Sequence, residues 1–367
     1  MEFSSGKPIK TTTAMRKIYA FLMSAVALVG FAACTEGLND EGIRVEVNKE
    51  EVSIFASFDE DDTRMTLNGK TPVWEKGDVI TINGFEFTAQ ESGTSVQFKG
   101  EVDASLIGAP FKAYYGGETV ADEQVAREGD MPKNTPAMAE GNAFESGMTI
   151  EFFNIAALLK FTPTFAGDIT FDILDGEAIT ITGCEANKEY YVAVTPATWT
   201  EGVVVSSNEI LCREGAKGQV IDRNKIYPLG TLDFKVYEKW GLVGQHQGWD
   251  ITKPSNIYYT TTPNLYAVKN IKLADNGFKF AKHGLSNWNT KNTYFGAWKK
   301  SSGKSYFNFI TEMSGGWYEV WLDNTGGQSE NIGVTNWNAT YDVYLRQATD
   351  YDHHIHYTVL PSGSARQ

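Results

Sequence analysis

Basic residues, helical periodicity and the familiar catalytic motifs are all scarce or missing in this sequence. Its 367 residues include 32 Lys or Arg against 46 Asp or Glu, which leaves a formal charge of −14 and no basic stripe. Without such a stripe the chain is not expected to bind nucleic acid or an anionic membrane surface. Apolar residues at helical spacing are rare beyond the amino-terminal region, so β-structure is expected for most of the chain.

No P-loop, no Ser-His-Asp arrangement and no GxGxxG in its proper context is present. Glycoside hydrolysis needs a pair of carboxylates flanking a cleft, and no spacing singles out a pair among Asp250, Asp275, Glu312, Glu319 and Asp323. His354 and His356 stand on one face of an expected strand, and two such residues can bind zinc. A third ligand is not evident beside them. We therefore expect that the chain is not an enzyme and that it binds no cofactor and no metal.

Aromatic residues and glycine are abundant. Aromatics make up 13% of the chain and there are 35 Gly, which suits β-sandwiches with many turns. The length exceeds that of one small domain and fits two or three. We predict an all-β chain of tandem β-sandwich domains.

The amino terminus predicts an export signal. Met15 is a candidate for the true start, because basic residues and then an apolar run over 18–33 follow it. The run is short for a membrane span of about 20 residues. Its end, F-A-A-C at Cys34, resembles the bacterial lipobox, which implies cleavage and lipid modification of Cys34. An ordinary signal peptide or a membrane anchor is the alternative.

The segment 35–44, which begins T-E-G-L-N-D-E, is expected to be a flexible acidic tether. It resembles the signal that sends some lipoproteins to the outer face of the outer membrane. The resemblance implies a lipid-anchored protein facing the cell exterior. A solvated linker is the simpler alternative.

Cys34 is assigned to lipidation, which leaves Cys184 and Cys212. They could form a disulfide in an oxidising envelope compartment. Two buried free thiols are the equally open alternative.

Apolar residues alternate with polar ones from Arg44 onward, as strands with one buried face require. T-R at Thr63 and W-E-K-G-D over 74–78 follow. These features resemble the fimbrillin-like family, which implies a two-part β-sandwich region over 45–235. We expect Trp74 to lie in the core and W-E-K-G-D to be structural.

The resemblance extends to a buried apolar run over 152–163 and a closing strand over 226–232. Alternation predicts further strands over 168–173, 178–181 and 190–195. The polar segment 118–147 is predicted to be a long loop between the two parts.

Fimbrillin-like proteins are pilus subunits or related surface lipoproteins. In their pilins, cleavage after an arginine frees a strand, and strand addition then builds the fibre. Arg44 and Arg64 are the candidate cleavage points here. The resemblance therefore implies an alternative function as a pilus subunit or tip adhesin, with other pilus subunits as partners.

The stretch W-G-L-V-G-Q-H-Q-G-W-D over 240–250 opens a distinct aromatic-rich part of the chain. We expect a strand over 240–243 and then a loop that ends with Trp249 beside Asp250. With F-K-F over 278–280 and Y-D-V-Y-L over 341–345, this part resembles the carbohydrate-binding domains of SusE/SusF-type outer-membrane lipoproteins. The resemblance implies an immunoglobulin-like, carbohydrate-binding sandwich over 236–360, followed by a tail over 361–367.

Sugars bind by laying the C–H face of the ring on an indole while polar side chains bond the hydroxyls. The candidate glycan-binding residues of these types are Trp249, Asp250, Lys279, Trp288, Asn289, Trp298 and Lys299. Each indole could instead be half-buried core, and Trp240, Trp317 and Trp321 fit the core better. Because Gln247 and Ala281 depart from the family pattern, starch does not follow as the ligand.

These observations predict a non-catalytic surface lipoprotein that binds polysaccharide through its carboxy-terminal domain. Outer-membrane uptake proteins are the partners that the resemblance implies. The pilus or adhesin subunit remains the alternative, and a module that only contacts proteins is a third.

Overall fold

The computed structural model describes residues 49–58, 73–133, 135–273, 277–288, 294–295, 310–312, 316–321, 332, 339–347 and 354–364. Among them the regular structure consists of β-strands and short 3-10 turns, which confirms the all-β prediction. No helix in these ranges is long and apolar enough to cross a membrane. Cys34, Arg44 and Arg64, the lipidation and cleavage candidates, lie outside the described residues.

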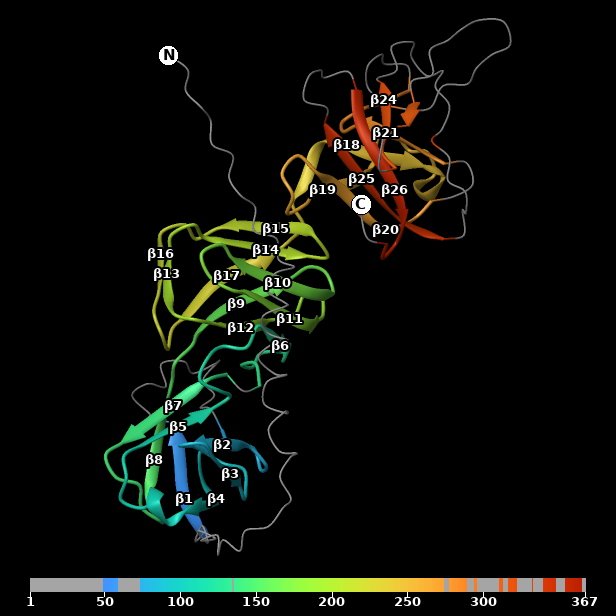
Figure 1. Cartoon of the computed structure of the whole chain (residues 1–367). Helices are drawn as coiled ribbons and strands as arrows, with labels where there is room; N and C mark the ends of the chain where they lie inside the picture. The colour runs from blue at the N-terminus through green and yellow to red at the C-terminus, as the bar shows by residue number, and fades with distance from the viewer. Residues whose placement is uncertain are drawn as a thin grey trace, which may run out of the picture. The chain divides into compact units, whose positions relative to one another are not determined.

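The first group of strands closes on itself in the order β1-β4-β3-β2-β5-β7-β8 (Figure 1). Its strands are β1 (Lys49–Phe58), β2 (Val79–Ile82), β3 (Phe85–Ala89), β4 (Ser95–Asp103), β5 (Phe111–Tyr115), β7 (Ala137–Gly141) and β8 (Thr149–Asn154). All neighbours are antiparallel except β1 and β8, which are parallel and complete the closure. Alternate residues of β1 point inward, as the period of two in the sequence predicts.

Trp74 lies at the centre of this first core and is fully buried. Its ring stacks on Phe58 with centroids 4.4 Å apart and meets Phe98, Tyr115 and Phe152 edge to face. In the turn after it, Glu75 N donates to Asp78 Oδ2 (2.8 Å), and Gly77 has φ 92°. The prediction that W-E-K-G-D is structural is confirmed.

The second group is a sandwich of two sheets around one core. A five-stranded sheet, β15-β14-β10-β11-β6, faces the three-stranded sheet β12-β9-β17, and β13 pairs with β16. The strands are β6 (Glu123–Val125), β9 (Ala157–Pro163), β10 (Gly167–Ile173), β11 (Ala178–Cys184), β12 (Tyr190–Val194), β13 (Ala197–Trp199), β14 (Val203–Ser207), β15 (Ile210–Gly215), β16 (Gln219–Ile221) and β17 (Ile226–Leu232).

Two expectations for this region are wrong. The predicted loop over 118–147 contains β6 and β7, because pairing with distant strands orders segments that have little apolar pattern of their own. The buried Gln124 side chain, for example, bonds both the N–H and the C=O of Ala193 (2.9 and 2.8 Å). The apolar run over 152–163 is two strands, β8 and β9, which belong to different sheets.

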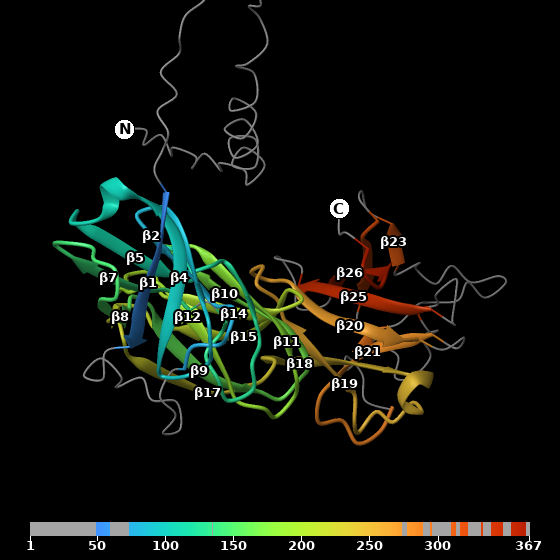
Figure 2. The same cartoon turned by 90° about the horizontal axis from the view of Figure 1, so that it is seen from below.

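The third group is one sheet of nine strands in the order β22-β21-β18-β19-β20-β25-β26-β24-β23. They are β18 (Val236–Gly244), β19 (Ser255–Tyr259), β20 (Tyr266–Lys272), β21 (Phe278–Lys282), β22 (Tyr294–Phe295), β23 (Ile310–Glu312), β24 (Tyr318–Trp321), β25 (Thr340–Gln347) and β26 (His354–Pro361). Figure 2 shows β20, β25 and β26 of this sheet side by side. One core joins residues of β18 and β21 to residues of β25 and β26, so the sheet curls around it. Trp240 and Trp317 are buried, as predicted.

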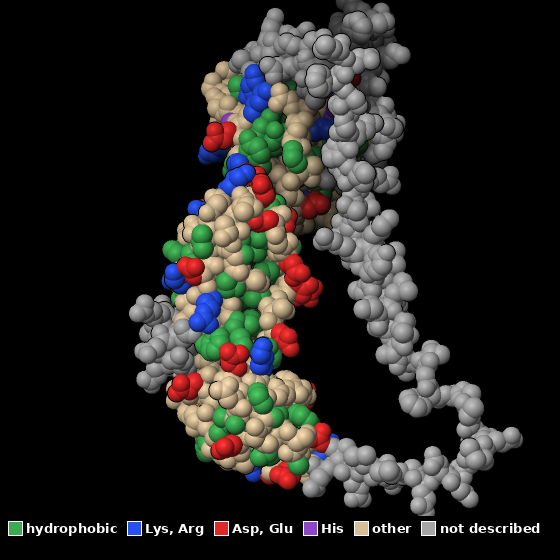
Figure 3. Space-filling view, turned by 60° about the vertical axis from the view of Figure 1, so that its left-hand side comes forward, with side chains coloured by type: hydrophobic (Ala, Val, Ile, Leu, Met, Phe, Trp, Pro, Cys, Tyr) green, Lys and Arg blue, Asp and Glu red, His purple; other side chains and the backbone are tan. Residues whose placement is uncertain are grey.

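The surface carries charges of both signs. On the face shown in Figure 3, acidic and basic side chains of the described residues are interspersed, without a continuous basic area.

Candidate functional site

The loop after β18 presents Trp249. β18 ends at Gly244, a 3-10 turn covers Gln245–Gln247, and Gly248 and Trp249 both have positive φ, 75° and 58°. The Trp249 N–H donates to Gly244 O (2.9 Å), and its indole N–H donates to Gln245 Oε1 (3.2 Å). The loop therefore fixes the indole without burying it.

Gln247 and Asp250 stabilise the same loop. Asp250 N donates to Gln247 Oε1 (2.9 Å), and Gln247 Nε2 donates to the carbonyl of Asp250 (2.8 Å). The Asp250 carboxylate accepts from Thr252 Oγ1 (2.6 Å) and Thr252 N (3.0 Å). These bonds lower the pKa of the Asp250 carboxyl, so it is ionised at neutral pH. Gln247, which departs from the SusE/SusF pattern, thus holds the turn.

Three predicted site residues from separate segments meet beside this loop. The Trp249 and Trp288 rings lie 6.2 Å apart at 58° to each other. Lys279 on β21 places Nζ 5.5 Å from the Trp288 ring centre, which is within cation–π range. Trp288 packs on Val243, Ile251 and Ala281, a small apolar cluster next to the main core.

The residues of this group differ in how far they are exposed to solvent. Trp249 and Trp288 are half-buried, whereas Lys279 is only 6% exposed. Because its ammonium lies over the indole, Lys279 is placed to orient Trp288. The other predicted ligand residues, Asn289, Trp298 and Lys299, lie outside the described residues.

Cys184 and Cys212 are free thiols, so the possible disulfide is not present. They lie on β11 and β15, which are separated by β10 and β14 in the sheet. Three strand spacings are about 14 Å, whereas a disulfide needs Cα atoms within about 7 Å. Burial raises the pKa of each thiol to about 12.

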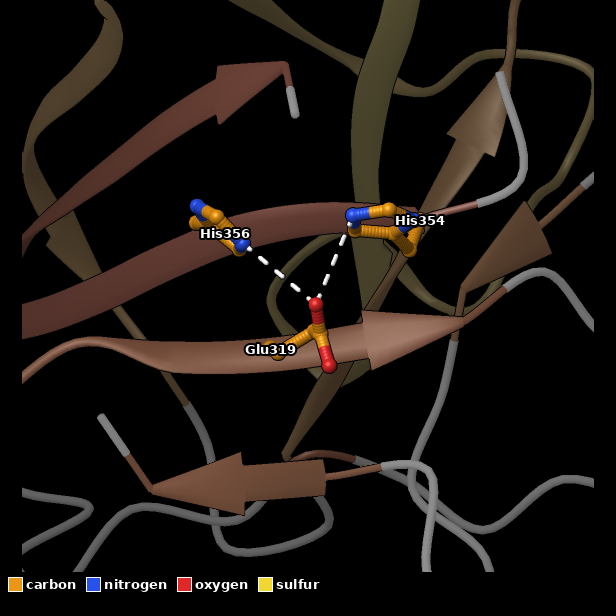
Figure 4. A group of neighbouring side chains, drawn as sticks. All are labelled: Glu319, His354 and His356. Atoms are coloured by element: carbon orange, nitrogen blue, oxygen red, sulfur yellow. Dashed lines mark ion pairs between the residues drawn. The ribbon is translucent and has the colours of Figure 1, made fainter. Parts of the chain in front are cut away.

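Glu319, His354 and His356 meet on the outer face of β24 and β26 (Figure 4). His354 Nε2 and His356 Nε2 lie 3.4 and 3.5 Å from Glu319 Oε1. Glu319 pairs with His356 in the β24–β26 register. The intervening residues Val320 and Ile355 point into the core, which turns the three polar side chains to the opposite face.

Arg346 on β25 completes this polar group. Its Nε donates to His356 Nδ1 (3.2 Å), and its guanidinium lies 4.3 Å from the Trp317 ring centre. Burial, followed by the charge of Arg346, lowers the pKa of His356, so the ring is neutral at pH 7. Since Nδ1 accepts a hydrogen bond, the neutral ring carries its proton on Nε2, toward Glu319.

Sequence reasoning missed Glu319 as the third member of this group. The His354-x-His356 spacing was visible, but the neighbour of that strand is set by pairing across the chain. The available signal was the alternation Tyr318-Glu319-Val320, which puts Glu319 on the polar face of a short strand.

A hollow of about 380 Å3 lies in the second group of strands. Ile173, Ile179 and Trp199 form apolar parts of its wall, and Asp122 and Asp175 line it as well. One oxygen of Asp175, Oδ2, accepts from both Thr200 N and Thr200 Oγ1 (2.7 Å each). No predicted site residue lines this hollow.

Comparison with known proteins adds little. No family model matches the chain, and no curated protein matches it. Two solved structures are similar, both candidate cell adhesion proteins: one from Bacteroides uniformis (17% identity, 49% of this chain and 92% of that one) and one from Bacteroides ovatus (14%, 51% and 96%). The TM-score is 0.30 in each case, at which neither likeness carries an inference for this chain.

Proposed function

We propose that this chain is a non-catalytic, surface-exposed protein that binds a glycan at Trp249 and Trp288. The observation that carries the proposal is the meeting of two half-buried indoles, from separate segments, beside an ordered polar loop. An indole left partly open to solvent keeps a large apolar face that a core would normally cover.

The chemistry of the group suits a sugar ring. Its C–H face would lie on one indole, and burial of that face contributes roughly 25 cal/mol per Å2. The second indole, inclined at 58° to the first, would contact the neighbouring sugar residue of the glycan or the edge of the same sugar ring. Asp250 Oδ1 accepts from Thr252, so Oδ2 of this ionised carboxylate beside Trp249 would be the acceptor for a hydroxyl group. A single site of this size binds weakly, so many copies on a surface would act together.

The remaining parts of the proposal come from the sequence. A lipid on Cys34 would anchor the protein in the outer membrane, facing the cell exterior, and outer-membrane uptake proteins would receive the captured polysaccharide. Two or more acyl chains on one protein anchor it stably in the membrane, whereas the membrane binding of a single chain is marginal.

The test is retention of the purified chain on a panel of soluble and insoluble polysaccharides, compared with Trp249→Ala and Trp288→Ala. We expect retention on one class of glycan and its loss in both variants. Phe55→Ala is the matched control, because Phe55 is an aromatic residue of β1 that is 40% exposed and belongs to another sheet.

Retention that survives both substitutions would refute this site. Absence of retention on every glycan would refute the function and favour the pilus or adhesin alternative. That alternative predicts a chain cleaved after Arg44 or Arg64 and recovered with fibres, which mass spectrometry of surface material would detect.

A further inference from the structure

We propose that Glu319, His354 and His356 bind a divalent transition metal ion of the zinc class, at a site separate from the glycan site. The three side chains come from two paired strands, β24 and β26, and converge on one point of the outer face (Figure 4). Their ligand atoms all lie within 4.8 Å of one another.

The separations of Glu319 Oε1 from the two imidazole nitrogens suit tetrahedral coordination. Ligand atoms about 2.0 to 2.2 Å from a tetrahedral metal ion are about 3.3 to 3.6 Å from each other. The two distances from Glu319 Oε1, 3.4 Å to His354 Nε2 and 3.5 Å to His356 Nε2, fall in that range. A metal ion would therefore need little movement of the backbone.

The donor types select the kind of metal. Two imidazole nitrogens and one carboxylate oxygen suit Zn2+ and its neighbours, whereas Ca2+ and Mg2+ take oxygen ligands almost entirely. Three protein ligands leave the fourth position to water. The side chains of His356 and Glu319 are 17% and 24% exposed, so an ion can reach them from solvent.

Arg346 opposes binding in a defined way. A metal on His356 Nε2 would leave the ring proton on Nδ1, which now accepts the Nε–H of Arg346. Two donors cannot share that hydrogen bond, so Arg346 must release His356 when the metal binds. Arg346→Met would remove both the competing donor and the positive charge, and would keep an unbranched side chain next to Trp317.

The ion would also act as a cross-strand link. It would join β24 to β26 through the side chains of Glu319, His354 and His356. A ligand bound by the native state alone stabilises that state by mass action. Metal binding should therefore raise the thermal midpoint of unfolding as the Zn2+ concentration increases.

The experiment is equilibrium dialysis of the metal-free full chain against Zn2+, with Co2+ as a spectroscopic probe. We expect one ion per chain and the absorption typical of tetrahedral Co2+. Because loss of even an outer-shell partner costs 10- to 100-fold in affinity, we expect Glu319→Gln and His356→Asn to weaken binding by at least about 100-fold. Arg346→Met should tighten it.

His246→Gln is the matched control, since His246 lies in the 3-10 turn after β18, not on β24 or β26, and its ring bonds Ser255 (3.1 Å). It should bind Zn2+ like the native chain. Unfolding of every variant in chelator separates a lost site from a lost fold. Binding that is absent in the native chain, or unchanged in Glu319→Gln, His356→Asn or Arg346→Met, would overturn the proposal. Neither result depends on glycan binding.

Discussion

Trp249 is held in a backbone conformation that large side chains seldom adopt. Its φ of 58° follows the φ of 75° at Gly248, and such a conformation costs on the order of 1 to 3 kcal/mol for a residue with a side chain. Hydrogen bonds to Gly244 and Gln245 offset this cost and fix the indole. Strain of this kind concentrates at ligand-binding sites, which agrees with the proposed role of Trp249.

At the same scale, Cys184 and Cys212 should be almost inert toward thiol reagents. Their pKa rises from 9.0 to about 12, and the thiolate is the reactive form. Below pH 9 the native protein therefore holds far less thiolate than an exposed cysteine. We expect slow alkylation that accelerates as the pH rises.

Mass spectrometry of the peptides that contain each cysteine measures the rate. The denatured chain is the control and should react at the ordinary rate. Rapid native alkylation of Cys184 at pH 8 would contradict the burial that the structure shows.

The strand β18 connects the core to the candidate glycan site. Trp240 and Leu242 point into the core, and the register pairs Val243 with Lys279 on β21. A slip of one residue in this pairing would move Lys279 to the other face of the sheet. The position of the Trp249 loop relative to Lys279 thus depends on the β18–β21 register.

Gly241→Ala tests this strand. An added Cβ would lie 2.7 Å from Pro254 Cβ and 2.8 Å from the Ser255 carbonyl oxygen, so β19 would have to shift. Overpacking of this kind costs about 1 to 3 kcal/mol. Hydrogen exchange of the β18 amides should report a free energy of opening lower by that amount.

The control is Gly93→Ala, whose Cβ would meet the Val96 side chain at 3.3 Å and the Ser95 carbonyl only at 4.0 Å. It should lower the local free energy of opening by less. An equal decrease in the free energy of opening in the two variants would mean that the close approach of Pro254 and Ser255 to Gly241 has no special cost.

At the scale of the whole molecule, the three largest clusters of buried residues each belong to one group of strands. The first joins residues from Val52 to Phe152, the second from Ala157 to Leu232, and the third from Tyr237 to Tyr357. A substitution that destabilises one core should therefore lower the stability mainly of the strands around that core.

Trp74→Ala should show this separation. The indole is fully buried among four aromatic rings, and removal of such a side chain costs about 3 to 5 kcal/mol. We expect faster hydrogen exchange in β1 to β5, β7 and β8, with unchanged exchange in β18 to β26.

Val73→Ala is the neighbouring control, since Val73 is 58% exposed and should change little. If Trp74→Ala accelerated exchange equally in β25 and β26, the cores would be energetically coupled and the separation would be wrong.

Local pattern alone determined much of this protein: the all-β class, the alternating faces of β1, the buried Trp74 and the strand that carries Trp240. These features depend on the period of two along a strand and on turn residues, which neighbouring positions in the chain encode. The aromatic and polar residues of the candidate glycan site were also visible as types.

Only the tertiary structure decided which of them meet. Trp249 lies beside Trp288, and Glu319 beside His356, because strand pairing brings together segments far apart in the chain. The same non-local pairing ordered β6 and β7 within a segment that looked like a loop, and kept Cys184 apart from Cys212. Register and strand order arise from packing of the whole sheet, which no single stretch of sequence specifies.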